Sequence, residues 1–182
     1  MIEVSDNIHL KAIKIEDQPK LLKLVKQIYP PAYEHLWVNK NCSFYFTKFY
    51  SLEHLKLELS DQNAAYYFII YKSVTVGIFR LVYNTQFKDF PTVKSVYVNR
   101  IYLSTDAQGK GIAKILFNWM YKKAAEKNCE IIWLKAMDSQ MQALRFYEKQ
   151  NFRNSKPTQL NFELMHPHLR GMCVMYKRLS VI

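Results

Sequence analysis

The sequence predicts a mixed α+β fold with a mostly antiparallel sheet. Several short segments carry β-branched and aromatic residues in strand-like order, and others repeat apolar residues at helical spacing. The chain has 182 residues, of which 49% are hydrophobic, and this is enough for one substantial core. It contains only four glycines and neither an internal repeat nor a Gly/Ser linker. We therefore expect a single domain over residues 1–182.

The N-terminal part is expected to open with a strand and continue with helices. Residues 8–15 (IHLKAIKI) alternate apolar and polar side chains as a half-buried strand does. The next segment places four apolar residues on one helical face, namely Leu21, Leu22, Val25 and Ile28. After turn-like residues 30–41, a second helix over 44–61, bent or in two pieces, is indicated by Phe49, Leu52, Leu55 and Leu59.

The central part is expected to hold three successive, mostly antiparallel strands. Residues 64–72, 75–84 and 92–103 are rich in β-branched and aromatic residues and are joined by short polar links. From Gly109 the pattern becomes that of a helix that buries Ile112, Leu116, Trp119 and Met120.

The remaining elements complete the sheet. Residues 130–137 read as a strand and residues 139–150 as a short helix. Two closing strands are predicted over residues 159–165 and 171–179. The edge that they offer could pair with a second chain.

The composition indicates the cellular compartment of the protein more clearly than its binding partner. The formal charge of +11 favours anionic partners but chooses none of them, and a solvated basic surface explains it equally well. The three cysteines, Cys42, Cys129 and Cys173, lack CxxC spacing and predict free thiols in a reducing compartment rather than a disulfide or zinc site. The N-terminus lacks a signal-peptide core, and no stretch nears the roughly 20 apolar residues of a membrane span. We expect a cytoplasmic protein without a membrane partner.

Residues 106–116 (DAQGKGIAKIL) have the chemistry of a phosphate-binding loop. A strand, a glycine-containing turn and a helix start present unpaired backbone N–H groups to one point, where the helix dipole favours negative charge. Gly109 and Gly111 allow an anion close to the backbone, and Lys110 and Lys114 add attraction. The loop lacks the GxxxxGK[ST] pattern, and Lys114 replaces the third glycine of a dinucleotide fingerprint.

Two motifs carry a resemblance to a known family. Gln108, Gly111 and Ala113 fit the pattern Q/R-x-x-G-x-G/A, and residues 140–152 (QMQALRFYEKQNF) fit N-x-x-A-x-x-F-Y-E-K-x-G-F. In the second motif, Gln140 replaces Asn and Asn151 replaces Gly; Asn tolerates positive φ better than most residues. Over residues 93–153 the chain resembles the GCN5-related N-acetyltransferases (GNAT), and its layout is similar to the polyamine-acetyltransferase-like members.

The resemblance implies a GNAT-like fold of about seven strands and about four helices, with acetyl-CoA as co-substrate. It implies that the backbone of Ile101, Tyr102 and Leu103 pairs with the pantetheine arm. The pyrophosphate would be bound by Gln108, Gly109, Lys110, Gly111, Ile112 and Ala113. Gln140 would contact the pantetheine or adenosine side, and Lys149 would approach a coenzyme phosphate. A homodimer is suggested by the resemblance to the family and not by the residues themselves.

The chemistry of acetyl transfer asks for an acid and for a neutral amine. A lysine-type amine has a pKa of about 10.4, so its proton must be removed or its pKa lowered. Tyr147 matches the family tyrosine that protonates the leaving sulfur, although a tyrosine here could also simply pack between helix and sheet. No residue stands out as the base, and the unassigned candidates are Glu34, Glu163, His166 and His168.

The acetyl acceptor is expected to be a primary amine of a small molecule, such as a polyamine, or of a peptide. Tyr33, His35 and Trp37 occupy a segment that borders the acceptor site in the family, or else only cap the core. The sequence His166-Pro-His168 lacks further ligands, so no metal is expected.

Two other function classes fit parts of the sequence. One is a non-catalytic acyl-CoA-binding regulatory module, which would keep affinity for the coenzyme without an acceptor pocket. The other is a nucleic-acid binder, suggested by the basic charge and the many aromatic residues. The aromatic residues mostly follow periodicities that bury them, so no nucleic-acid partner is expected.

Overall fold

The computed structural model describes residues 1–179 and contains two compact units. Unit 1 comprises Met1–Leu81 and Arg100–Met120, and unit 2 comprises Val82–Asn99 together with the chain from Tyr121 onward. The strands β4 (Val74–Phe87) and β5 (Phe90–Leu103) and the helix α5 (Ile112–Glu126) each contribute residues to both units. Each unit is therefore built from more than one stretch of sequence.

The sheet of unit 1 begins with an N-terminal hairpin. Strands β1 (Ile2–Ser5) and β2 (Ile8–Ala12) pair antiparallel, and β2 pairs antiparallel with β3 (Ala64–Tyr71). Next to β3 come β4 and then β5. Because alternate side chains of β2 point to opposite faces, Ile8 and Leu10 are buried while His9 and Lys11 are only partly covered.

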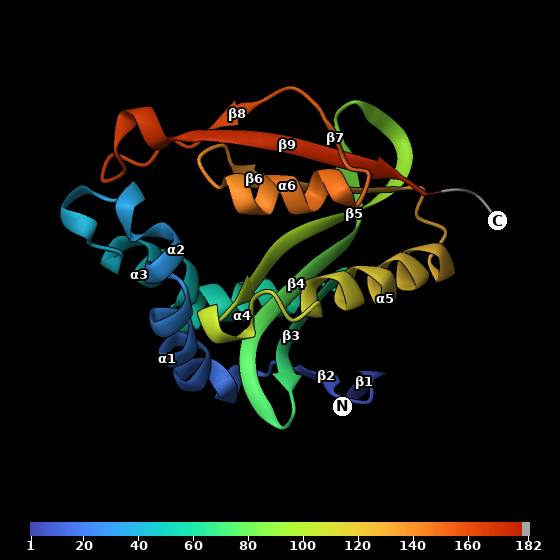
Figure 1. The fold of residues 1–182 in the computed structure, drawn as a ribbon, viewed down its shortest axis with the longest axis horizontal. Helices are drawn as coiled ribbons and strands as arrows, with labels where there is room; N and C mark the ends of the chain where they lie inside the picture. Colours follow the sequence, from blue (N-terminus) through green and yellow to red (C-terminus); the bar gives the residue numbers. More distant parts are fainter. Residues whose placement is uncertain (180–182) are drawn as a thin grey trace. The chain divides into compact units, whose positions relative to one another are not determined.

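The helices of unit 1 bury apolar faces, as expected, with one revision. They are α1 (Gln18–Ile28), the single turn α2 (Pro30–Tyr33), α3 (Ser43–Tyr50) and α4 (Leu52–Ser60) (Figure 1). The helix predicted over 44–61 does fall into two pieces, because Ser51 is extended and its side chain accepts a hydrogen bond from the His54 N–H at 3.2 Å, which caps α4. Leu52, one of the residues whose spacing indicated this helix, is 41% exposed, whereas Glu58 is buried.

Helix α5 buries Ile112, Leu116 and Met120 as predicted. The prediction for Trp119 was wrong, because this side chain is only half-buried, with its ring edge-on to Tyr67. Phe117 is fully buried in its place. A bulky ring on the flank of a helical face can lie on either side of the boundary, and helical spacing alone does not decide it.

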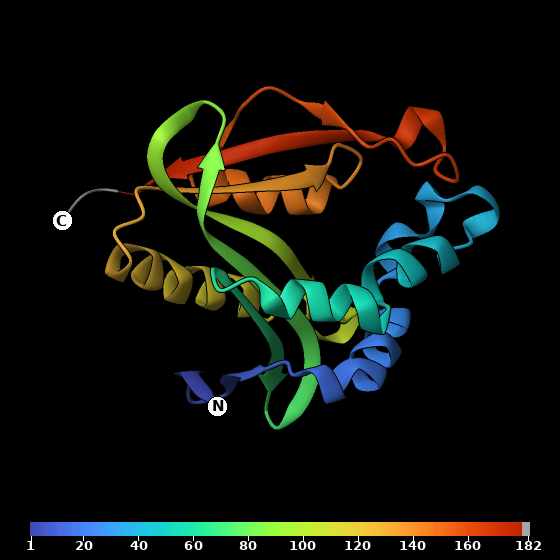
Figure 2. The same cartoon turned by 180° about the vertical axis from the view of Figure 1, so that it is seen from behind.

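Unit 2 has a sheet with one helix on one face. Strand β6 (Ile131–Met137) pairs parallel with residues 95–98 of β5 and antiparallel with β9 (Gly171–Arg178). The two-residue strands β7 (Arg153–Asn154) and β8 (Thr158–Gln159) both pair antiparallel with β9. Helix α6 (Met141–Lys149) lies over one face of β6 and β9, in front of them in Figure 1 and behind them in Figure 2.

The predicted fold class is confirmed, and the element counts need correction. Within residues 1–179 there are nine strands and six α-helices, rather than about seven and about four. The extra strands include β1 and two-residue pairings that carry no periodicity, and the strand expected over 159–165 retains only its first residue, within β8. Short 3-10 turns lie at Ile15–Asp17, Glu34–Leu36, Val38–Lys40, Thr105–Ala107 and Pro167–Leu169.

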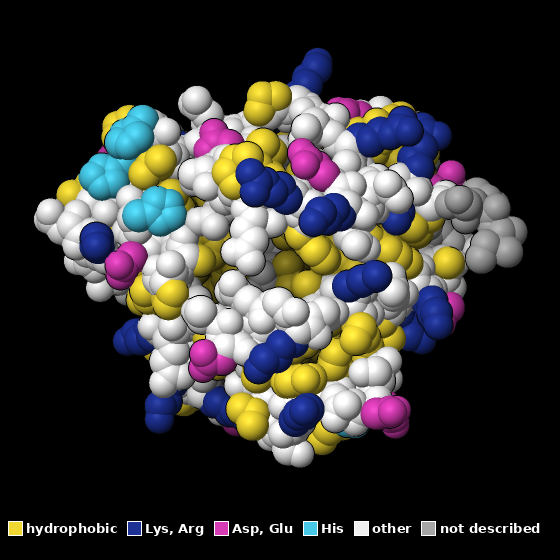
Figure 3. All heavy atoms as spheres, in the orientation of Figure 1, with side chains coloured by type: hydrophobic (Ala, Val, Ile, Leu, Met, Phe, Trp, Pro, Cys, Tyr) yellow, Lys and Arg dark blue, Asp and Glu magenta, His cyan; other side chains and the backbone are white. Residues whose placement is uncertain are grey.

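The surface is basic without a single dominant patch on the face seen in Figure 3, where Lys and Arg side chains lie scattered among other types. Cys42, Cys129 and Cys173 are free thiols, and the first two are buried. Over the described residues, no helix has the length and apolar character needed to cross a membrane.

Candidate functional site

The predicted phosphate loop lies at a strand-to-helix junction of unit 1. Strand β5 ends at Leu103, a 3-10 turn follows at Thr105–Ala107, and α5 begins at Ile112. The Ser104 N–H donates to the Val76 carbonyl at 2.8 Å, which ties the end of β5 to β4. At Gly77 any Cβ would collide with the Tyr102 carbonyl, so only glycine permits this close approach of the two strands. The junction is thus fixed by backbone contacts.

Ile101, Tyr102 and Leu103 are half-buried at the end of β5. The register of β5 with β6 runs from Ser95 to Val98 and so ends before Ile101. These residues therefore lie beyond the stretch of β5 that is paired with β6. This is where an added strand or an extended ligand can pair with the backbone.

The two glycines of the loop have the left-handed conformation that the motif requires. Gly109 has φ +72° and Gly111 has φ +76°, and a Cβ built at either position would meet no atom within 4 Å. Positive φ, rather than crowding by the protein, thus explains the glycines, and open space lies beside both. Because the first N–H groups of α5 have no partners within the helix, this space suits an anion.

The remaining loop residues lie around the glycines. Ile112 is 1% exposed and fixes the start of α5 in the core, while Ala113 is half-buried. Gln108 is exposed, and its Nε2 donates to the Leu103 carbonyl at 3.3 Å, which joins the loop to the end of β5. Lys110 is exposed, with Nζ 5.8 Å from the centre of the Tyr71 ring. All nine predicted coenzyme contacts within residues 101–113 therefore lie in one connected segment.

The three remaining predicted site residues belong to unit 2 and are spread along α6. Gln140 is the N-cap residue, and its N–H donates to the Met137 carbonyl at 3.0 Å. Lys149 is the exposed last residue of the helix. At about 1.5 Å per residue, Gln140 and Lys149 are about 13 Å apart, so they lie at opposite ends of α6.

Tyr147 is the predicted proton donor, and it is 8% exposed. Its ring centre lies 5.5 Å from that of Phe146 and 5.9 Å from that of Phe152. Burial raises the pKa of Tyr147 to about 12. The phenol therefore keeps its proton at neutral pH and is able to donate it.

Asn151, where the family motif has glycine, has φ +63°. Its N–H donates to the Glu148 carbonyl at 2.8 Å, and the Phe152 N–H donates to the Tyr147 carbonyl at 3.0 Å. This is the left-handed end of a helix, where Asn is the usual substitute for Gly. The motif departure is thus accommodated by the same backbone geometry.

The aromatic segment before α3 contributes mainly to the core. Trp37 is 1% exposed, and its Nε1 donates to the Tyr29 hydroxyl at 3.1 Å. The half-buried Tyr33 stacks on Tyr29 at 4.7 Å and lies 5.6 Å from Tyr102, by ring centres. His35 is exposed. This segment was predicted either to border the acceptor site or to cap the core. Trp37 packs in the core, while Tyr33 lies beside β5.

The candidate bases remain without a role. Glu34 forms an ion pair with Lys40 at 3.6 Å, and the rings of His166 and His168 lie 5.7 Å apart. Among residues 1–179, no group of three or more His, Cys, Asp and Glu side chains could hold a metal ion.

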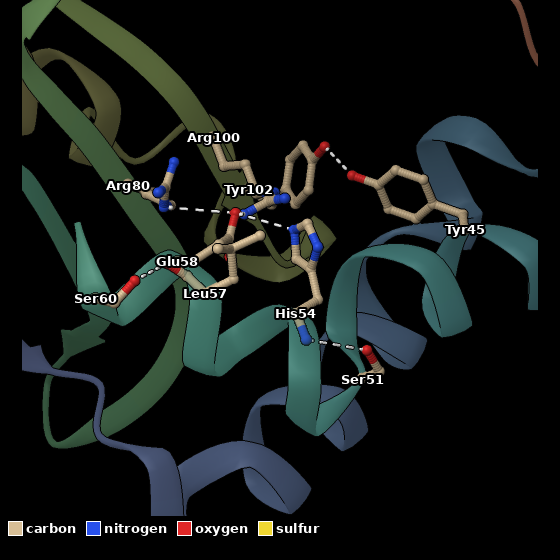
Figure 4. Close-up of polar contacts among 9 residues, drawn as sticks. All are labelled: Tyr45, Ser51, His54, Leu57, Glu58, Ser60, Arg80, Arg100 and Tyr102. Atoms are coloured by element: carbon tan, nitrogen blue, oxygen red, sulfur yellow. Dashed lines mark hydrogen bonds and ion pairs between the residues drawn. The ribbon is translucent and has the colours of Figure 1, made fainter.

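Sequence reasoning missed a buried polar group in unit 1, which we name the Glu58 cluster and which comprises His54, Glu58, Arg80 and Arg100. Glu58 Oε1 accepts a hydrogen bond from Arg100 Nη1 at 2.6 Å and lies 3.5 Å from Arg80 Nε and 3.4 Å from His54 Nε2 (Figure 4). Both arginines are 7% exposed. Two arginines inside otherwise apolar strands are the signal that could have revealed it.

Tyrosines surround this cluster. The Arg100 guanidinium carbon lies 5.3 Å from the ring centre of Tyr50 and 5.9 Å from that of Tyr66. The hydroxyls of Tyr45 and Tyr102 are hydrogen-bonded at 2.8 Å, and Figure 4 shows this pair next to Arg100 and His54. The cluster thus adjoins Tyr102, one of the predicted coenzyme-contact residues.

Comparison with known proteins decides the family. Residues 22–152 match the family model described as acetyltransferase (GNAT) family. The chain belongs to the GNAT acetyltransferase family. The match confirms the predicted enzyme class, an N-acetyltransferase that uses acetyl-CoA as co-substrate.

Solved structures agree with the GNAT fold of this chain. An N-acetyltransferase PaiA from Thermoplasma acidophilum in complex with coenzyme A superposes with a TM-score of 0.72 at 18% identity, covering 94% of this chain and 99% of that chain. The ribosomal L7/L12 alpha-N-protein acetyltransferase RimL in complex with coenzyme A gives 0.73 at 15%, covering 100% and 99%. Spermidine N-acetyltransferase from Vibrio cholerae, in complex with coenzyme A and spermine, gives 0.69 at 17%, covering 97% and 98%.

The predicted phosphate loop of this chain, residues 106–116, fits the coenzyme's pyrophosphate. The fit rests on the open space beside Gly109 and Gly111 and on the free N–H groups expected at the start of α5. When bound, acetyl-CoA would supply an activated acyl group as a thioester, and residues 101–113 would hold it.

Proposed function

We propose that the chain transfers the acetyl group of acetyl-CoA to a primary amine of a small molecule or peptide, by direct attack of the amine and with Tyr147 as general acid. The observation that carries the proposal is the strand–loop–helix junction of residues 101–113, with its left-handed glycines next to open space. A helix start of this kind binds phosphate without a specialised side chain. We also propose that residues 1–182 form one acetyltransferase domain.

Tyr147 supports the proposal through its protonation state. A proton donor to a departing thiolate must be protonated at the working pH. Because burial raises the pKa of Tyr147 to about 12, its acid form dominates throughout the neutral range. A tyrosine that only packed would meet the same description, so a substitution must separate the two.

The first experiment measures coenzyme A release from acetyl-CoA with a panel of polyamines, amino acids, aminoglycosides and peptides with free N-termini. We expect turnover with one class of amine and only background hydrolysis without an amine. Acetyl-CoA affinity, measured separately by calorimetry, is expected to be retained in either case. Affinity without turnover on any amine would favour the alternative, a non-catalytic acyl-CoA-binding regulatory module.

Tyr147→Phe tests the general acid. Loss of the phenolic proton should reduce kcat by about 10²- to 10⁴-fold, the usual contribution of general acid catalysis, with the Kd of acetyl-CoA nearly unchanged. Tyr176→Phe, which removes a hydroxyl from a half-buried tyrosine of β9, is the matched control and should keep full turnover. Unchanged kcat in Tyr147→Phe would reduce Tyr147 to a packing residue.

Polyamine and peptide acceptors both remain within the proposal. The Vibrio cholerae neighbour is a spermidine acetyltransferase and the L7/L12 neighbour a protein N-terminal one, so the fold accommodates either class. The expected cytoplasmic location is supported by the free thiols of Cys42, Cys129 and Cys173. A homodimer and the lack of a nucleic-acid partner stay expectations, to be checked by light scattering and by a salt-dependent binding assay.

A further inference from the structure

The Glu58 cluster carries more positive than negative charge. Two guanidiniums, Arg80 and Arg100, share a single carboxylate, and all three side chains are at least nine-tenths buried. Both guanidiniums approach the same oxygen, Glu58 Oε1. Asp61, which follows α4, also acts electrostatically on Arg80, and its Oδ1 accepts a hydrogen bond from the Asn63 N–H at 2.9 Å. Arg80, Arg100 and Glu58 together bear one net positive charge.

Hydrogen-bond donors also exceed acceptors. Arg80 Nε lies 3.5 Å from Glu58 Oε1 and makes no hydrogen bond to any residue from 1 to 179. The Tyr66 hydroxyl is buried beside Arg100 and likewise has no hydrogen-bond partner in this part of the chain. A buried donor without an acceptor costs about 1–3 kcal/mol, so such groups ask for an explanation.

The electrostatic surroundings of Arg80 are mixed. Burial lowers the pKa of Arg80, Glu58 opposes that effect, and Arg100 lowers the pKa further. Tyr66 and Asp61 raise it. Burial also raises the pKa of Tyr66, so its hydroxyl remains a donor. An anionic oxygen is the kind of acceptor that these donors lack.

The cluster adjoins the segment expected to hold acetyl-CoA. Arg100 and Tyr102 point to the same face of β5 because they are two residues apart on a strand. In Figure 4, Arg80 approaches the Glu58 carboxylate from one side, and Arg100 and His54 approach it from the other. The His54 side chain is 25% exposed, so the cluster reaches solvent at His54.

We infer that the Glu58 cluster, with Tyr66, is a carboxylate-binding site, and that the carboxylate it takes is that of the acetyl acceptor. This inference rests on the proposed function and narrows its substrate class to amines that also carry a carboxylate, such as amino acids or short peptides. One carboxylate balances the single net charge, whereas a phosphate dianion would exceed it. A polyamine would add positive charge to a site that already has an excess.

The test compares paired acceptors that differ only in the carboxylate. The pairs are lysine with pentane-1,5-diamine, phenylalanine with 2-phenylethylamine, and alanine with ethylamine. Because a charge-assisted hydrogen bond contributes about 1.5–3 kcal/mol, the carboxylate-bearing member should have a kcat/KM about 10- to 100-fold higher. Each decarboxylated amine is also assayed with added acetate, which tells whether a free carboxylate can fill the site.

A second arm measures binding without turnover. The Tm of the full chain is recorded with acetate or propionate and with the corresponding amides, at constant ionic strength. Ligands that bind the folded state raise the Tm, so the acids should raise it and the amides should not. Tyr66→Phe, which removes one donor and no charge, should reduce both this rise and the paired kcat/KM ratio. Tyr176→Phe is the control and should leave both unchanged.

The outcomes separate the two proposals. A preference for the carboxylate-bearing acceptors, or activation of the decarboxylated amines by acetate, supports the site and identifies the source of the carboxylate. Equal turnover within every pair, with no effect of acetate, overturns the carboxylate site and leaves the acetyltransferase standing. If no amine is turned over, the proposed function fails and the Tm arm decides alone: equal effects of acids and amides would overturn the site.

Discussion

The glycine loop (residues 108–113) and the Glu58 cluster lie in the same unit and are built in opposite ways. The loop is a run of neighbouring residues, largely exposed, whose donors are backbone N–H groups. The cluster is assembled from α4, β4 and β5, is almost fully buried, and uses charged side chains. A local backbone conformation such as that of the glycine loop can be recognised in a sequence, whereas a cluster of side chains from distant elements is seen only in the fold.

The largest effect is expected on stability, when Glu58 at the centre of the cluster is replaced. Glu58→Gln leaves two buried guanidiniums without a counter-charge, so unfolding free energy should fall by about 3–5 kcal/mol in urea titration. Glu53→Gln, at an exposed position of the same helix, is the control and should change it by less than about 0.5 kcal/mol. Similar small effects of both substitutions would mean that the two arginines are compensated by something other than Glu58.

A substitution in the loop should weaken coenzyme binding more clearly than it destabilises the fold. Gly111→Ala places a side chain at φ +76° beside the open space, so we expect the Kd of acetyl-CoA to rise about 10- to 100-fold, equivalent to one lost charge-assisted hydrogen bond. The strain itself costs about 1–2 kcal/mol. Asn128→Ala, at φ +55°, imposes comparable strain elsewhere and should leave the Kd unchanged. An unaltered Kd in Gly111→Ala would remove the loop from the coenzyme site.

The smallest effect is expected from the loop's exposed charge. Lys110→Gln should raise the Kd of acetyl-CoA about two- to fivefold at low salt, because an exposed charge contributes about 0.2–1 kcal/mol. At about 1 M salt the Debye length falls to about 3 Å, and the difference from the unaltered chain should vanish. Lys122→Gln, further along α5, serves as control. A salt-independent effect of Lys110→Gln would indicate direct contact rather than long-range attraction.

The same contrast explains how much the sequence could predict. The helix after the loop and the two-piece helix over 44–61 depend on residues a few positions apart, and both are present. The first begins at Ile112 rather than Gly109, and the second divides at Ser51, a position that the sequence did not specify. The positive φ of Asn151 was also foreseen from its place in the motif. In each case the local backbone requirement is visible in the residue type itself.

Burial across elements was harder to predict. Leu52 and Glu58 lie on the same helix, yet the leucine is exposed and the glutamate buried, because arginines from two strands meet Glu58. Helical spacing carries no information about partners in β4 and β5. The two-residue strands on β9 were missed for a related reason, since a pairing that short leaves no periodic pattern.

Unit 1 is completed only by residues 100–120, so the order in which the chain is synthesised affects when its core can form. As the chain emerges from a ribosome, Glu58 and Arg80 are made well before Arg100. Until Arg100 has been synthesised, Glu58 lacks its shortest contact. Its carboxylate then lies on the face of helix α4 that is buried in the finished fold. The nascent N-terminal segment should therefore stay sensitive to proteases until β5 has been added, and a ribosome-stalled series of lengths would reveal the protection as one late step.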